Sequence, residues 1–145
     1  MSEVRSGLAA ALAEASSPSW AQRVRAGRAL AGFAGSPEAA EVLVRLLLDA
    51  EDTAVTRQTA EALAQVGTVA AIRLIALAIA GADDSRFDWL QAGVYDALVE
   101  PDGVPDLVAA WVGLEAVCAQ LARDPEEAVR RGAAEISAWT GGTRR

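Results

Sequence analysis

Apolar residues recur along the chain at intervals of three and four, the spacing that places side chains on one face of an α-helix. The stretch DPEEAVRRGAAEISAW, close to the C-terminus, shows this clearly, with Val129, Gly132 and Ile136 on one face. Asp124 is suited to cap the first turn, and Pro125 suits the first helical position. We therefore predict a helix here, and the small Gly132 lets a neighbouring helix approach closely.

The same order of residues occurs three times earlier in the chain. Each copy begins with an acidic residue or a Ser-Pro pair, continues with Arg and small residues, and reaches a late leucine. The late leucines are Leu30, Leu63 and Leu98, spaced by 33 and then 35 residues. In the first copy, Ser17 and Pro18 are the expected cap and first helical residue. Such periods are typical of stacked helical repeats.

A second, more apolar helix is predicted after each of these three copies, over 36–50, 68–82 and 104–123. The middle one is apolar almost all round, which predicts packing on both sides. A turn at 101–103 precedes the last of them. Short connections favour antiparallel pairs. The expected units are 1–15 as a capping helix, 16–50, 51–82, 83–123, and 124–140 as a terminal helix.

Composition supports a single all-α domain and argues against several functions. Of 145 residues, 52% are hydrophobic but only 5% aromatic, and Ala and Leu dominate, which favours helices over strands. The net charge of −7 argues against nucleic-acid binding. With no His and one Cys, we expect no metal, no cofactor and no catalysis. The most apolar window, 68–82, is interrupted by Arg73 and is too short to span a membrane, so we expect a cytoplasmic protein.

The segments SSPSWAQRVRAGRALAGFAG, DTAVTRQTAEALAQVG and DPEEAVRRGAAE resemble HEAT repeats, in particular the short bacterial HEAT-like type also found in phycobilin-lyase-related proteins. The copy at 84–98 fits the pattern but carries larger residues, Phe87, Trp89 and Tyr95. The resemblance covers nearly the whole chain. It implies a right-handed α-α superhelix, a HEAT-like solenoid of about four antiparallel helix pairs. It also implies a protein-binding scaffold whose second helices line the binding face.

Polar and aromatic residues on the second helices are therefore the candidate partner-binding residues. Arg73 interrupts an apolar helix and must reach solvent or a partner. Trp111 lies among small residues, where a groove is expected. The other candidates on these helices are Glu41, Arg45 and Glu115. We expect a protein partner, and a monomer or weak dimer.

Other conspicuous residues have structural explanations. Arg25, Arg57 and Arg130 are expected to pair with acids of neighbouring repeats, such as Glu51, Asp52, Asp83, Asp84 and Glu126. Three tryptophans on the first helices, Trp20, Trp89 and Trp139, are expected in or near the core. Cys118 is expected to be a small buried hydrophobe, because no activating base is available.

Four functions stay open at this point. The first is a protein-binding adaptor, one form of which is an inhibitor or immunity protein for one specific and basic target. A DNA-repair-type binder conflicts with the charge. A bilin lyase or chaperone rests on family analogy alone. A regulatory module beside a larger enzyme is indistinguishable from an adaptor by sequence.

Overall fold

The described part of the chain consists of helices joined by short turns. The computed structural model describes residues 2–98 and 107–143, and within them it has eight α-helices and no strand. The helices are α1 (Ser2–Glu14), α2 (Trp20–Ala31), α3 (Pro37–Leu47), α4 (Thr53–Val66), α5 (Val69–Gly81), α6 (Asp84–Leu98), α7 (Leu107–Leu121) and α8 (Glu127–Thr143). The all-α solenoid is confirmed. The handedness of its superhelix and the division into units stay predictions, and the turn expected at 101–103 lies outside the described residues.

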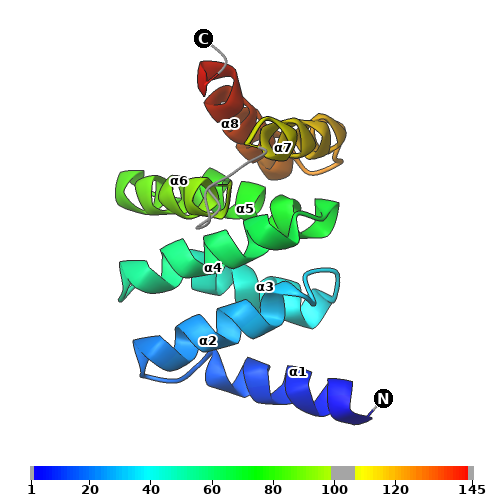
Figure 1. Ribbon diagram of the computed structural model, residues 1–145. Coiled ribbons are helices and arrows are strands. Elements are labelled where there is room, and N and C mark those ends of the chain that lie inside the picture. The colour runs from blue at the N-terminus through cyan, green and yellow to red at the C-terminus, as the bar shows by residue number, and fades with distance from the viewer. Residues whose placement is uncertain (1, 99–106, 144–145) are drawn as a thin grey trace.

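The first helices form one closely packed layer, in which α2, α4 and α6 lie one above another (Figure 1). Glycines allow the close approach. A Cβ on Gly93 of α6 would lie 2.3 Å from the carbonyl oxygen of Arg57 in α4. A Cβ on Gly27 of α2 would lie 2.5 Å from Oγ1 of Thr59. These glycines of the repeated segments are therefore placed where a neighbouring helix packs directly against the helix backbone.

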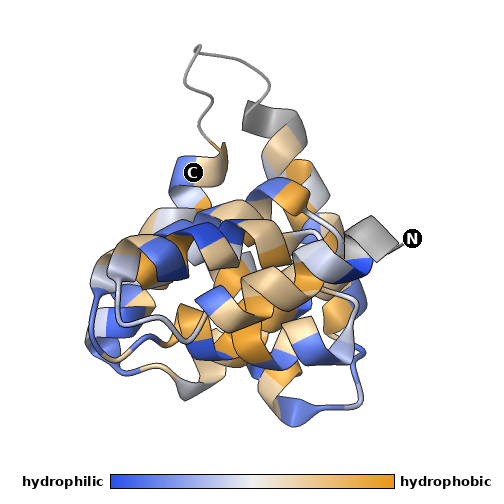
Figure 2. Cartoon of the chain, turned by 90° about the horizontal axis from the view of Figure 1, so that it is seen from below, coloured by the Kyte–Doolittle hydropathy of each residue, from blue (hydrophilic) through white to orange (hydrophobic). Residues whose placement is uncertain are grey.

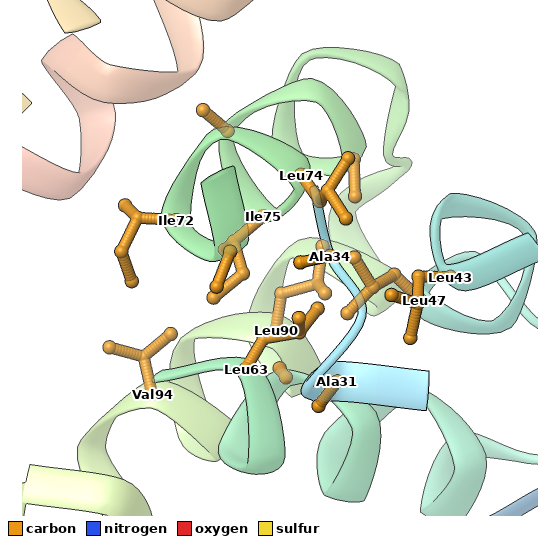
Figure 3. Packing of buried hydrophobic residues seen from close by; sticks show 14 of the residues in the cluster. Ala31, Ala34, Leu43, Leu47, Leu63, Ile72, Leu74, Ile75, Leu90 and Val94 are labelled. Atoms are coloured by element: carbon orange, nitrogen blue, oxygen red, sulfur yellow. The ribbon is translucent and has the colours of Figure 1, made fainter. Parts of the chain in front are cut away.

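The core lies between this layer and the second helices α3 and α5. Viewed along the stack, apolar residues are concentrated between the helices, and hydrophilic residues mark the turns (Figure 2). Helix α5 packs against neighbours on several sides, as its uniformly apolar sequence predicts. The buried side chains that meet here include Leu43, Leu47, Leu63, Ile72, Ile75, Leu90 and Val94 (Figure 3).

The C-terminal pair, α7 and α8, departs from this order. Helix α8 packs mainly against α5, a second helix, although its sequence copies the first helices. A Cβ on Gly132 would lie 2.0 Å from the carbonyl oxygen of Ala76, so the predicted close approach is confirmed, with α5 as the neighbour. Helix α7 packs against α8 and α5 more than against α6. The regular stacking of first helices therefore ends at α6.

Two predicted helix starts are wrong by two residues each. Helix α2 begins at Trp20 rather than Pro18, and the Ser19 hydroxyl caps it by accepting from the backbone N–H of Gln22. Helix α8 begins at Glu127 rather than Pro125. In both places the residue expected to cap the helix, Ser17 or Asp124, stabilises the preceding turn instead. Its side-chain oxygen accepts from the backbone N–H two residues on, and this hydrogen bond stabilises a turn.

Candidate functional site

Glu41 and Arg45 are exposed on α3, as their candidacy for partner binding requires. They lie four residues apart and therefore on one side of the helix. Neither forms an ion pair or side-chain hydrogen bond with any residue that the structure describes. Their charges are therefore available to a partner that binds the second helices α3 and α5, which we call the second-helix layer.

Arg73, also predicted for the binding face, holds the C-terminal pair to α5. Its Nε donates to Asp124 Oδ2 at 2.9 Å, and its Nη2 lies 3.2 Å from Glu126 Oε1. The hydrogen bond from Arg73 lowers the pKa of the Asp124 carboxyl, and the N–H of Glu126 adds to the effect. Arg130 donates to the carbonyl oxygen of Asp124. The guanidinium of Arg73 is thus engaged inside the fold.

An equivalent arrangement holds the turn between α3 and α4. Arg23 donates to both carboxylate oxygens of Asp49, at 3.1 and 3.4 Å, and lies 3.6 Å from Glu51. Arg86 donates to the carbonyl oxygen of Asp49, as Arg130 does to that of Asp124. We call these the Asp49 cluster and the Asp124 cluster. The sequence alone does not reveal these clusters, because Arg23 lies far from Asp49 along the chain and Arg73 lies far from Asp124.

Trp111 is half-buried and packs on α6 rather than standing free. Its ring meets Tyr95 at 5.5 Å between centroids, edge to face, and Tyr95 lies 6.2 Å from Trp139. Phe87 also meets Trp139, at 5.8 Å. Such ring pairs stabilise packing beyond their buried area. Phe87 and Tyr95 of the 84–98 copy therefore fill the space between α6 and the C-terminal pair.

Glu115 and Cys118 lie on α7, where they belong to the packing of the C-terminal pair. Glu115 is half-buried and interacts with other residues of the chain. Cys118 is buried as expected, with 3% of its surface exposed. Burial raises the pKa of its thiol to about 11, and the charge of Glu115 adds to this. A protonated, buried thiol is a poor nucleophile.

The remaining sequence expectations are met in part. Arg25 pairs with Glu14 and Arg57 with Asp96, so both bridge to neighbouring helices, though to acids other than those expected. Trp139 is buried and Trp89 half-buried, but Trp20 is 50% exposed, and its expected place in the core is wrong.

Arg23 of α2 reaches the turn between α3 and α4. That side chain spans from the carbonyl oxygen of Ser17 to Asp49 and is nearly buried. Trp20, as the first residue of α2, lies at the end of the helix.

A hollow lies beside the turn between α4 and α5, and no pattern in the sequence predicted it. It measures about 520 Å³, within the range of binding pockets. Its lining residues are uncharged and come from α4 to α7: Ala64, Gln65, Gly67, Ile72, Val94, Ala97, Leu98, Ala110, Gly113 and Leu114. We call it the uncharged hollow.

Exposed apolar side chains adjoin this hollow in sequence. Among the described residues, four large hydrophobic side chains are exposed, and Val66, Val69 and Val112 are three of them. Val66 and Val69 flank the turn that lines the hollow, and Val112 precedes Gly113.

No group of His, Cys, Asp and Glu among the described side chains could hold a metal ion. No helix in 2–98 or 107–143 is both long and apolar enough to cross a bilayer.

Comparison with known families gives one match. Residues 6–98 match the family model described as HEAT repeats. The match ends at the last residue of α6, where the regular stacking of first helices also ends. No curated protein and no solved structure matches the chain significantly.

Proposed function

Since the chain belongs to the HEAT repeat family, whose arrays commonly mediate protein–protein interaction, we propose that it is a non-enzymatic scaffold that binds a protein partner through its second-helix layer. One observation carries the proposal: α3 presents Glu41 and Arg45 to solvent without partners in the described chain. Charged groups that the fold does not use are available to orient a partner. Arg73 and Trp111, by contrast, are engaged in the fold and would contribute only through their remaining exposed atoms.

Affinity capture from a lysate of the source organism tests this function. The test variant is the double charge swap Glu41→Arg/Arg45→Glu, which leaves the net charge unchanged and alters two exposed residues. The matched control is Glu127→Arg/Arg131→Glu, an exposed pair with the same spacing on α8. We expect one protein to be recovered by the wild type and the control and lost with the test variant.

Two other outcomes count against parts of the proposal. If no protein is enriched over empty beads, the scaffold function is wrong. If the same protein is recovered by all three forms, the scaffold function stands and its surface lies away from Glu41 and Arg45. Sedimentation of the same samples tests the expectation of a monomer or weak dimer.

An inhibitor of one basic target is the second candidate, and the distribution of acids favours it. The turns that lead into α4, α6 and α8 are rich in Asp and Glu, and the chain carries a net charge of −7. Attraction between opposite charges on exposed surfaces is screened by salt. Capture that weakens steeply as salt rises would favour this form of the scaffold, and capture insensitive to salt would exclude it.

A further inference from the structure

Two accessible stripes of side chains run along the second-helix layer. Apart from its first and last residues, α5 is buried except at four positions with the spacing i, i+3, i+7 and i+10, which are Ala70, Arg73, Leu77 and Ala80. At the same spacing, α3 and its C-cap carry Glu38, Glu41, Arg45 and Leu48, and the three charged residues among them are exposed. We call these sets the α5 stripe and the α3 stripe.

Both stripes face away from the first helices. Helix α5 is covered by α4 and α6 on one side, by α3 below and by α8 above, so the α5 stripe lies on the side that is left open (Figure 1). Helix α3 likewise packs against α2 and α4. Short turns reverse the chain twice between α3 and α5, so the two helices run in the same direction. Glu38 therefore lies at the same end of the layer as Ala70, and Leu48 at the same end as Ala80.

One end of the paired stripes is acidic. Glu38 and Glu41 form no ion pair or side-chain hydrogen bond with any residue in 2–98 or 107–143. Arg73, the charged residue of the α5 stripe, is already bonded to Asp124 and Glu126. The two glutamates of α3 are therefore left to attract basic groups of a partner.

The opposite end of the paired stripes is more apolar. It carries the half-buried Leu48, Leu77 and Ala80, together with the exposed Arg45. An apolar side chain of a partner would pack on the two leucines, whereas a basic side chain would meet the like charge of Arg45. A partner that covers both stripes must therefore be basic at one end and apolar at the other.

We propose that the paired stripes bind one amphipathic helix of a protein partner, with two Lys or Arg side chains over Glu38 and Glu41 and two apolar side chains over Leu48 and Leu77. This rests on the proposed scaffold function and names the chemistry of its partner. The α3 stripe is about 15 Å long at 1.5 Å per residue, so a partner helix covers it in about ten residues. Residues at i, i+3, i+7 and i+10 share one face of a helix, so the basic pair takes two neighbouring positions of this set and the apolar pair takes the other two.

Titration with designed peptides, followed by fluorescence anisotropy, tests the site without knowledge of the natural partner. The probe is an alanine-based helical peptide with Lys at i and i+3 and Leu at i+7 and i+10. The control peptide has the same composition but alternates the two, with Lys at i and i+7. General attraction to the net charge of −7 therefore acts equally on both peptides. The test variant is Glu38→Lys/Glu41→Lys, and the matched control is Asp84→Lys/Asp88→Lys, which reverses two exposed acids of α6.

We expect the probe to bind the wild type about tenfold more tightly than the control peptide at about 0.15 M salt, where distant charges are screened. The test variant should lose about tenfold or more in affinity for the probe, because two attractions become repulsions, and should bind a peptide with Glu in place of Lys instead. The α6 variant should keep the preference for the probe. Thermal melts show whether each variant is folded. Equal binding of both peptides, binding of neither, or equal losses in both variants overturns the proposal.

Two combined results separate this proposal from the scaffold function. A lysate partner that is lost with the Glu41/Arg45 swap, while neither peptide binds the wild type, would leave the scaffold standing and overturn the basic and apolar helix as its ligand. Preference for the probe, lost with Glu38→Lys/Glu41→Lys, would support the chemistry of the site even where capture from the lysate recovers no protein and counts against the scaffold function.

Discussion

The helices up to α6 and the pair α7–α8 use the same kind of close contact to build different arrangements. In the first region, Gly93 brings α6 against α4, so a first helix stacks on a first helix. In the second, Gly132 brings α8 against α5, so a helix with first-helix sequence stacks on a second helix. A small residue permits close approach but does not select the neighbour.

Aromatic side chains on α6 account for the difference. Phe87 and Tyr95 meet the ring of Trp139, so α8 approaches α6 through rings rather than through backbone. Helix α5 offers the small Ala76 opposite Gly132, and the Asp124 cluster fixes the start of α8 to Arg73 of α5. Ring packing against α6 and ion pairs with α5 together set the position of the C-terminal pair.

Alanine at the two glycines should give the largest effects and separate the regions. Gly93→Ala places a methyl group against the Arg57 backbone and should lower the free energy of unfolding by about 3 kcal/mol or more. Gly132→Ala should loosen α7 and α8 while α2 to α6 keep their protection. Urea unfolding followed by circular dichroism gives the first effect, and hydrogen exchange by mass spectrometry gives the second. Gly32→Ala, in open space, is the control.

Equal loss of protection throughout the chain with Gly132→Ala would show instead that the pair and the array unfold as one unit.

The Asp49 and Asp124 clusters should differ in their contribution to the free energy of unfolding, because their side chains differ in burial. The side chains of Arg23 and Asp49 are 7% and 10% exposed, so Arg23→Met leaves a buried carboxylate and should cost about 3 kcal/mol. Arg73 is 34% exposed, and Arg73→Met should cost under about 1 kcal/mol. Urea titrations of both variants check the order. Equal losses of unfolding free energy in the two variants would mean that contact geometry determines the strength of these ion pairs more than burial does.

Acid should weaken the Asp124 cluster. The folded-state pKa of Asp124 is lowered, chiefly by the hydrogen bond from Arg73, below the value of about 3.9 in an unfolded chain. Its contribution to stability is therefore complete above about pH 5 and is lost as the pH falls through the folded-state pKa. The stability difference between wild type and Asp124→Asn should shrink from about pH 5 toward about pH 2, measured by thermal melts. A constant difference over that range would contradict this assignment.

The smallest expected effect has the opposite sign. Gly113 lies within α7 with no atom near its missing Cβ, so Gly113→Ala should stabilise that helix by about 0.5–1 kcal/mol. The rate at which a thiol reagent labels Cys118 reports this stabilisation, because the buried thiol reacts only when α7 opens. The labelling rate should fall with Gly113→Ala and rise with Gly132→Ala. An unchanged rate in both would show that labelling follows global unfolding.

Part of the candidate site was predictable and part was not. Helical spacing and polarity sufficed to predict that Glu41 and Arg45 would reach solvent from α3. Arg73 was also recognised as a charge that must reach solvent or a partner, but its partner Asp124 is 51 residues away and could not be identified. The uncharged hollow needs four helices to form its lining, and no local pattern specifies such a site.

The sequence by itself determined that the chain is a stack of helices, where small residues allow close contact, and which family it belongs to. These features depend on local spacing, which repeats every few residues and survives without knowledge of the neighbours. Only the tertiary structure decided that α8 rests on α5, that Arg73 binds Asp124, and that residues from α4 to α7 line one hollow. Those outcomes depend on side-chain volume and charge brought together from segments far apart in the chain, where several packings share the same local pattern.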